Sequence, residues 1–479
     1  MAPRLVVISN RVAVPTSGRP RAAGGLAVAV KAALKGRTGI WFGWSGEVSD
    51  APDPEPRIVE RNKVTYAVID LSSADHQEYY NGFANRVLWP TLHYRVDLAE
   101  YSRVDLAGYL RVNRIFADDI SKFLLPDDVV WVHDYHLMPL AHELRARGHE
   151  NSIGFFLHIP CPPPDILLTL PRHEETLGML CHYDLVGFQT DNDRDNFKRY
   201  LSSRGGVIGR DGATCDIDGQ TVRLGTFPVG IETSIFARLA RNAGRSAFTR
   251  EFQNSLAGAR LVVGVDRLDY SKGLRERIEG VGAFLGARAD WHRKVTFLQI
   301  TPASRGDIKE YAEIDRAVSE QVGRINGRYG DASWTPIRYT NRSHTRTALA
   351  GIYRAADVAL VTPLRDGMNL VAKEFVAAQD PADPGVLVLS QFAGAAAELD
   401  GALLVNPHEA EAFPGAISAA LEMPLDERVA RHSTMFARIS RQNVDRWAEQ
   451  FLSALNEAKK KPGFLGGIRS LFRERATAP

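Results

Sequence analysis

Short runs that are apolar at almost every position recur along the chain and alternate with segments of helical pattern. Runs without a polar face are typical of strands buried on both faces, and their alternation with helices predicts βαβ units and parallel sheets. The number of these runs predicts two sheets. The runs are LVVIS (5–9), VVWVHD (129–134), IGFFLHIP (153–160), DLVGFQT (184–190), RLVVGVD (260–266), KVTFLQIT (294–301), VALVTPL (358–364) and GVLVLSQ (385–391).

The runs fall into two groups, and the chain between them predicts a domain boundary. Pro228 and Gly230 end a strand-like segment, and a polar helix follows. A length of 479 residues suits two such domains. We expect an N-terminal domain over 1–235, a C-terminal domain over 236–440, a helix over 441–458 that packs back on the N-terminal domain, and a basic mobile tail over 459–479.

Charge and cysteine content exclude several classes of protein. Lys and Arg number 59 against 57 Asp and Glu, a net charge of +2, which argues against a nucleic-acid binder. Three cysteines without paired spacing argue against a disulfide scaffold or a zinc ribbon. The N-terminus resembles no signal peptide and no apolar run is long enough to span a membrane, so we expect a cytoplasmic protein that binds no membrane.

In open α/β sheets ligands bind at the carboxyl ends of the strands, so the residues there carry the functional argument. Ser9 to Arg11 close the first strand, and Gly24 and Gly25 open the next helix. Such glycines let backbone N–H groups approach a phosphate, although a glycine pair before a helix is more often a simple turn. The segment GGLAVAV lacks the G-x-G-x-x-G spacing of dinucleotide-binding proteins.

A later strand end, in the second half of the chain, carries two cations. In GVDRLDYSKGL, Arg267 and Lys272 suit a diphosphate, but surface pairing with Asp266 and Asp269 is an equal alternative.

In LVTPLRDGMNLVAKEF, Asp366 lies in a turn before a helix that begins near Asn369. The start of that helix would attract phosphate, and Asp366 could accept hydrogen bonds from sugar hydroxyls. Glu374 could accept from a ribose, or it could be an ordinary solvated carboxylate.

Asp134 and His158 each follow an apolar strand in the first half. His133, His136 and His158 could be metal ligands, but HDYH at a strand end lacks the i, i+4 spacing of helical zinc motifs, so we expect no metal.

Aromatic residues of the first half predict contacts with a sugar. Trp41, Tyr80 and Trp89 offer flat apolar faces with polar edges, while Trp44, Tyr79 and Phe83 are expected in the core. Arg305, like Arg11, could bind a second phosphate.

Taken in order, these motifs resemble the trehalose-6-phosphate synthase family of glycosyltransferases, from about Arg4 to Ala458. The segments that carry the resemblance are SNR…GGL, WFGWSGE, EYYN…LWP, HDYHL, FFLHIPCP, DRLDYSKGL, SRGD, RINGRYG, TPLRDGMNLVAKEFVAAQDP and VLVLSQFAGAA. The resemblance implies the GT-B fold, two Rossmann-like domains that face a deep cleft. It implies transfer of glucose from a nucleotide-glucose, most simply UDP-glucose, to glucose 6-phosphate, and it implies a homo-oligomer.

The resemblance also implies roles for individual residues. Those at the glucose 6-phosphate site would be Arg11, Trp41, Tyr80, Trp89, Asp134 and Arg305. The donor site would comprise Gly24, Gly25, His158, Arg267, Lys272, Asp366, the backbone of Leu370, Val371, Ala372 and Lys373, and Glu374 at the ribose. The catalytic group would be Asp134, His158, Arg267, Lys272 and Asp366.

One position departs from the family pattern, and it concerns the nucleotide base. Where some members have a phenylalanine near the base, this chain has His344, which leaves UDP-, GDP- and ADP-glucose open as donors. The family's proposed course is front-face attack with retained configuration, in which the leaving phosphate oxygen takes the acceptor's proton. Because Arg267, Lys272 and a helix N-terminus could stabilise the leaving diphosphate as fixed charge, we expect no metal cofactor.

Three rival functions remain. A related synthase could use another acceptor, as in a glucosylglycerol-phosphate synthase or a pseudoglycosyltransferase. A nicotinamide-dependent oxidoreductase is disfavoured by the missing glycine spacing. A silent regulatory subunit is disfavoured because the charged site positions are present.

Overall fold

The computed structural model describes residues 3–15, 25–302 and 309–460. The chain forms two compact units, unit 1 with residues 1–228 and 447–479, and unit 2 with residues 229–446. The division predicted from the sequence lies at 235–236, and the predicted return of the chain to the first domain lies at 441. The predicted tail over 459–479 lies almost wholly outside the described residues.

Unit 1 is built on a ten-stranded sheet in the order β3-β4-β2-β1-β5-β6-β7-β10-β9-β8. Neighbours from β4 to β10 pair in parallel, whereas β3, β9 and β8 pair antiparallel at the two edges. The parallel centre confirms the expectation from the apolar runs, and the antiparallel edges are additional. The strands are β1 (Leu5–Arg11), β2 (Gly39–Val48), β3 (Arg57–Arg61), β4 (Val64–Leu71), β5 (Val129–His133), β6 (Ser152–Phe156), β7 (Leu185–Phe188), β8 (Val207–Ile208), β9 (Thr214–Ile217) and β10 (Gln220–Thr226).

Helices of several kinds connect these strands. The α-helices are α1 (Gly25–Leu34), α2 (Ser73–Asp75), α3 (Trp89–Leu92), α4 (Arg103–Ser121), α5 (Leu140–Ala146), α6 (Pro164–Leu167) and α7 (Asp191–Ser203). The others are the π-helix η1 (His76–Leu88) and the 3₁₀-helices η2 (Val96–Leu98), η3 (Tyr135–Leu137), η4 (His173–Glu175) and η5 (Leu177–His182).

The last helix, α16 (Val444–Lys460), packs on the sheet of unit 1 through aromatic side chains. The ring of Phe451 stacks on that of Trp131 at 4.5 Å between centroids. A Cβ atom at Gly154 or Gly187 would lie 2.8 Å from the Phe451 ring, so the two glycines leave the room that this ring occupies.

Unit 2 is built on a six-stranded, all-parallel sheet in the order β13-β12-β11-β14-β15-β16. Its strands are β11 (Arg260–Val265), β12 (Val295–Ile300), β13 (Ile337–Thr340), β14 (Val358–Val361), β15 (Val386–Ser390) and β16 (Leu403–Val405). Buried residues of β11 and β12, including Val262 and Phe297, form a core with Phe284. The second predicted parallel sheet is thereby confirmed.

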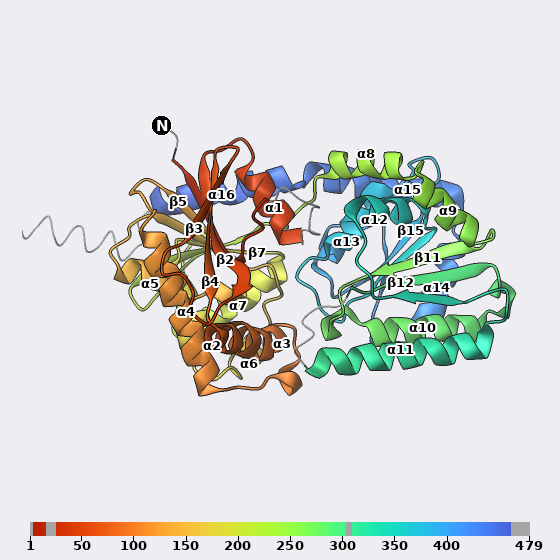
Figure 1. Cartoon of the computed structure of the whole chain (residues 1–479), viewed down its shortest axis with the longest axis horizontal. Helices are drawn as coiled ribbons and strands as arrows, with labels where there is room; N and C mark the ends of the chain where they lie inside the picture. Colours follow the sequence, from red (N-terminus) through yellow and green to blue (C-terminus); the bar gives the residue numbers. More distant parts are fainter. Residues whose placement is uncertain (1–2, 16–24, 303–308, 461–479) are drawn as a thin grey trace, which may run out of the picture. The chain divides into compact units, whose positions relative to one another are not determined.

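Helices cover both faces of this sheet. Figure 1 shows α10 and α11 along one side of the strands and α12 and α13 on the other. The helices are α8 (Thr233–Ala243), α9 (Ala247–Ser255), α10 (Leu274–Ala287), α11 (Lys309–Tyr329), α12 (Arg346–Ala355), α13 (Leu370–Ala378), α14 (Ala412–Glu422), α15 (Leu425–Arg441) and the 3₁₀-helices η6 (Tyr270–Lys272), η7 (Ala289–Trp291) and η8 (Gly394–Ala397).

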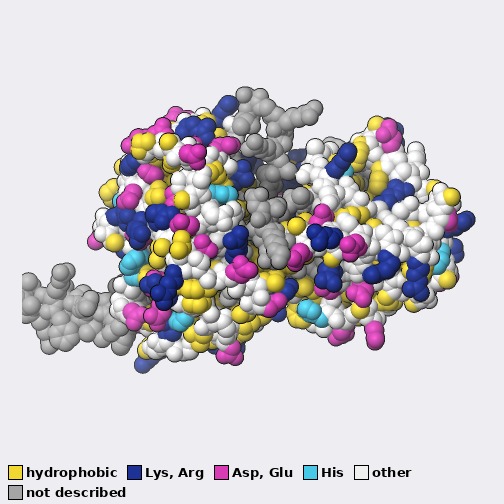
Figure 2. All heavy atoms as spheres, turned by 60° about the horizontal axis from the view of Figure 1, so that its bottom comes forward, with side chains coloured by type: hydrophobic (Ala, Val, Ile, Leu, Met, Phe, Trp, Pro, Cys, Tyr) yellow, Lys and Arg dark blue, Asp and Glu magenta, His cyan; other side chains and the backbone are white. Residues whose placement is uncertain are grey.

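The surface agrees with the balanced composition. Figure 2 shows Lys and Arg side chains interspersed with Asp and Glu over the face that it presents. Among the helices that the structure describes, each is too short or too polar to cross a lipid bilayer.

Candidate active site

In unit 1, the register of two neighbouring parallel strands, β5 and β6, brings the predicted Asp134 and His158 together. Asp134 directly follows β5 and His158 lies two residues beyond β6, whose last residue, Phe156, pairs with His133. The N–H of Asp134 donates to the carbonyl of Phe156 at 2.9 Å. The N–H of His158 donates to Oδ1 of Asp134 at 3.3 Å. The carboxylate therefore lies over the carboxyl edge of the sheet.

The backbone of Asp134 is strained. Its φ is 75° and its ψ is 164°. This region is essentially reserved for glycine, because the Cβ of any other residue crowds the backbone, at a cost of about 1–3 kcal/mol. Such strain persists only where the surrounding structure imposes it, and it concentrates at functional sites. The conformation is an independent indication that Asp134 is functional.

A second histidine orients His158. Nδ1 of His133 lies 3.1 Å from Nε2 of His158, and both rings are neutral because burial lowers the pKa of His158 to about 3 and that of His133 well below its usual value. Nε2 of His133 is buried and has no hydrogen-bond partner among the described residues.

The unpartnered nitrogen decides where the protons lie. A buried N–H without an acceptor costs free energy, so the favoured tautomer of His133 carries its proton on Nδ1 and donates to His158. Nε2 of His158 then accepts, and its Nδ1 carries a proton that it can donate.

The aromatic residues predicted for the acceptor lie near a π-helix. Tyr80 of η1 is half-buried and stacks with His136 at 5.8 Å and with His76 at 5.4 Å between ring centroids. Arg11, exposed at the end of β1, lies over the ring of Trp44 at 5.7 Å. Trp89 is buried against His93 at 4.1 Å. π-helical turns are frequent at functional sites.

The interpretation of Trp41 as a wall of the acceptor site is wrong for this structure. Its side chain is 0% exposed, and its Nε1 donates to Oγ of Ser9 at 2.8 Å inside the core. Trp41 lies in β2, which pairs with β1 on one side and β4 on the other, and its ring is buried on a face of this sheet. The expected core positions of Trp44, Tyr79 and Phe83 are confirmed.

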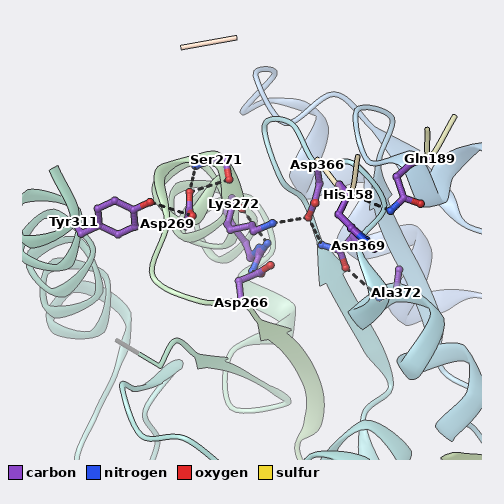
Figure 3. A network of polar contacts seen from close by, with 11 residues as sticks. His158, Gln189, Asp266, Asp269, Ser271, Lys272, Tyr311, Asp366, Asn369 and Ala372 are labelled. Carbon is purple, nitrogen blue, oxygen red and sulfur yellow. Dashed lines mark hydrogen bonds and ion pairs between the residues drawn. The ribbon is translucent and has the colours of Figure 1, made fainter. Parts of the chain in front are cut away.

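In unit 2, the predicted Lys272 and Asp366 form an ion pair at the carboxyl edge of the sheet. Nζ of Lys272 donates to Oδ2 of Asp366 at 2.6 Å, and the amide of Asn369 donates to the same oxygen at 3.0 Å. Oδ1 of Asn369 in turn caps α13 by accepting from the N–H of Ala372 at 3.2 Å. Figure 3 shows this chain of contacts running from Lys272 to Ala372.

The alternative in which Asp266 and Asp269 hold Lys272 is wrong. Asp266 binds the buried guanidinium of Arg277 at 2.6 Å. Asp269 accepts from the hydroxyl of Ser271 at 2.9 Å and from that of Tyr311 at 3.3 Å (Figure 3). Both aspartates thus build the loop that carries Lys272.

The start of α13 offers donors for an anion. The first N–H groups of a helix have no partner within it, and this end carries partial positive charge. Asn369 already caps the N–H of Ala372, so within the part of the chain that the structure describes, those of Leu370 and Val371 are left to bind a ligand. The Lys373 side chain takes no part, because it is buried and its Nζ contacts Glu398 at 2.5 Å.

Glu374 follows one turn into α13 and is half-buried. Burial raises the pKa of its carboxyl from 4.5 to about 7, while the charge of Arg346 opposes the shift. Its charge therefore changes near neutral pH, which distinguishes it from an ordinary solvated carboxylate.

The remaining predicted residues lie at the surface or outside the described ranges. Arg267 is exposed after β11, and Gly25 is exposed as the first residue of α1. His344 is half-buried, with its ring 6.4 Å from that of Phe248, and burial lowers its pKa. Gly24 and Arg305 lie outside the described residues.

The sequence did not predict the roles of two supporting residues. Asn369 was noted only as a helix start, although asparagine before a helix is a typical capping residue. His133 was considered only as a metal ligand. Its contact with His158 joins two strands, and a single sequence gives no signal for that pairing.

Comparisons with known proteins agree with this geometry. Residues 4–457 match the sequence model of glycosyltransferase family 20. A trehalose-6-phosphate synthase of Sinorhizobium fredii is 52% identical over 96% of this chain and 100% of its own length.

Two solved structures are similar throughout. An α,α-trehalose-phosphate synthase (UDP-forming) of Burkholderia xenovorans in complex with glucose-6-phosphate is 47% identical, with a TM-score of 0.91 over 95% of this chain and 100% of that one. A protein of E. coli bound with UDP-2-fluoro glucose is 47% identical, with a TM-score of 0.90 over 96% of this chain and 99% of that one. The family resemblance drawn from the motifs is confirmed: the chain belongs to glycosyltransferase family 20.

Proposed function

We propose that this chain transfers glucose from UDP-glucose to glucose 6-phosphate and forms α,α-trehalose 6-phosphate with retained configuration at the donor carbon. The observation that carries the proposal is the contact between Lys272, Asp366 and Asn369 at the start of α13. It combines a cation and helix N–H groups for a diphosphate with a carboxylate for sugar hydroxyls. The relatives that bind glucose-6-phosphate and UDP-2-fluoro glucose support the two substrates.

The donor would bind on unit 2. Lys272 and the exposed Arg267 would hold the diphosphate together with the N–H groups of Leu370 and Val371. Asp366 would accept hydrogen bonds from the glucose hydroxyls, and Glu374 would accept from the ribose. His344 would lie toward the base, at the position where the family varies.

The acceptor would bind on unit 1. Arg11 would bind the phosphate and Tyr80 would donate its hydroxyl to it, while Trp89 and Asp134 would contact the sugar. His158, with Nδ1 protonated, would donate to a donor-glucose hydroxyl.

The main chemical task of these residues would be to stabilise charge. Negative charge develops on the leaving diphosphate as the bond to glucose breaks, and cations fixed in advance stabilise it without reorganisation. The leaving phosphate oxygen would take the proton of the attacking hydroxyl, which needs no protein base. Lys272 and Arg267 would supply the charge that a divalent metal supplies in other transferases, so we expect turnover to be insensitive to EDTA.

A substrate panel tests the proposal. Purified chain is incubated with UDP-, GDP- or ADP-glucose and with glucose 6-phosphate or glycerol 3-phosphate, and released nucleotide and product mass are measured. We expect the product of UDP-glucose and glucose 6-phosphate in excess over every other pair. A dominant product from glycerol 3-phosphate would instead identify the related synthase.

A further inference from the structure

Unit 2 contains a polar cavity of about 440 Å³ at the edge of its sheet opposite to Lys272 and Asp366. Two of its lining residues, Asp357 and Gly385, directly precede β14 and β15. The cavity thus lies at the amino ends of the parallel strands, whereas Lys272 and Asp366 lie at the carboxyl ends. The four residues of β14 separate the two edges by roughly 13 Å, at a rise of about 3.3 Å per residue.

Every aspartate that lines this cavity is already paired with an arginine. These pairs neutralise the acidic side of the lining, but each carboxylate keeps lone pairs that can accept from a ligand hydroxyl. The pairs are Asp357–Arg260 at 2.5 Å, Asp380–Arg354 at 2.7 Å and Asp383–Arg428 at 2.6 Å.

Two lining arginines remain after this pairing. Arg241 lies in the last turn of α8, and Arg245 lies in the short loop before α9. Neither forms an ion pair with any residue that the structure describes. The cavity therefore presents two exposed guanidinium groups that form no ion pair with the carboxylates of its lining.

Charge and size together define a ligand class. Two guanidinium groups without an ion-pair partner among the described residues match the double charge of a phosphate monoester, and each can bind two of its oxygens at once. A cavity of about 440 Å³ lies in the range of small-molecule sites and exceeds the volume of a single phosphate. The amide of Gln253 and the paired carboxylates offer partners for hydroxyl groups around the rest of the ligand.

We infer that this cavity binds the phosphate monoester of a small polyol or sugar, at a site separate from the proposed donor and acceptor sites. The phosphate lies between Arg241 and Arg245, and the hydroxyl groups face Gln253 and the paired aspartates. This inference does not depend on the proposed transferase activity.

Calorimetric titration of the full chain with glycerol 3-phosphate tests the site. The test variant is R241Q/R245Q, and the control is R250Q/R275Q, which removes two exposed arginines of the same unit that do not line the cavity. We expect the test variant to lose one class of binding site, or to bind at least about tenfold more weakly. The control should bind as the unchanged chain does, and glycerol should not bind. Equal stoichiometry and affinity in test variant and unchanged chain would overturn the inference, since the binding would then belong to the acceptor site.

A second measurement needs no variant. Crystals of the full chain grown without phosphate are soaked in tungstate, a heavy analogue of phosphate. Density between Arg241 and Arg245 supports the site. Tungstate bound only elsewhere in the chain contradicts it, even if the test variant fails to fold.

Discussion

Nζ of Lys272 lies 2.6 Å from Oδ2 of Asp366, 94 residues further along the chain, and both side chains are largely buried. The pair holds a cation and a hydrogen-bond acceptor at one place, on the loops that follow β11 and β14. A ligand that brings a diphosphate and a sugar could use both groups without moving either.

Replacing Lys272 with alanine should lower kcat/KM for the nucleotide-sugar by about 100-fold or more, because the preorganised charge at the leaving diphosphate is lost. Steady-state kinetics measures the change. R275A is the matched control, since Arg275 is an exposed cation three residues away on α10. If both variants kept similar turnover, Lys272 would have no role at the diphosphate.

The strain at Asp134 predicts an inverted stability order. At ordinary φ, glycine destabilises a chain relative to alanine, but at φ 75° it relieves the strain. D134G should therefore have a higher Tm than D134A, by an amount that corresponds to about 1–3 kcal/mol, and neither variant should retain normal turnover. Asp127, exposed and outside the positive-φ residues, gives the control pair, in which alanine should be the more stable. The same order at both positions would argue that Asp134 is unstrained.

Glu374 predicts a pH dependence of stability. Its pKa is about 7 in the folded chain and 4.5 ordinarily, so the folded state holds this proton more tightly than the unfolded state. The resulting stabilisation is complete below pH 4.5 and is lost as the pH rises through about 7.

The E374Q variant has no such proton. As the pH is raised from 5 to 8, its free energy of unfolding should therefore increase relative to that of the unchanged chain, by on the order of 1–3 kcal/mol. Tm measured at both pH values gives the comparison, with E279Q, an exposed carboxyl of α10, as control. A difference that is independent of pH would contradict the raised pKa.

His133 should act as a positioning residue for His158. H133N keeps an N–H close to the position of Nδ1 and should retain most of the turnover, whereas H133L should lose about 10–100-fold, as supporting residues of this kind do. ¹⁵N NMR of labelled histidines, assigned with H158N, should show the Nδ1–H form of His158 in the unchanged chain and in H133N, and a mixture in H133L. The same tautomer in all three proteins would assign His133 a merely structural role.

The fold could be predicted from the sequence because a strand that is buried on both faces is apolar at almost every position, and this pattern is visible locally. The apolar runs at 129–134 and 153–160 became β5 and β6, and those at 260–266 and 358–364 became β11 and β14. The antiparallel edge strands were missed, since β3, with the sequence RIVER, is short and mostly exposed.

Site residues that directly follow a strand could be predicted from the sequence. Contacts between residues far apart in the sequence could not. Asp134, His158, Lys272 and Asp366 all follow strands that are apolar at almost every position. The partner of Lys272 could not be read locally, because two nearer aspartates competed for it and are held by Arg277, Ser271 and Tyr311. Trp41 does not line the acceptor site because it lies on a covered face of the sheet. The residue type alone does not reveal this position.

The conformation of Asp134 has a consequence for engineering. A library selected only for heat resistance would enrich glycine at this position, because the fold gains by the exchange. Thermostabilisation of this chain therefore needs a screen for turnover at each round, and residue 134 is best held fixed from the start.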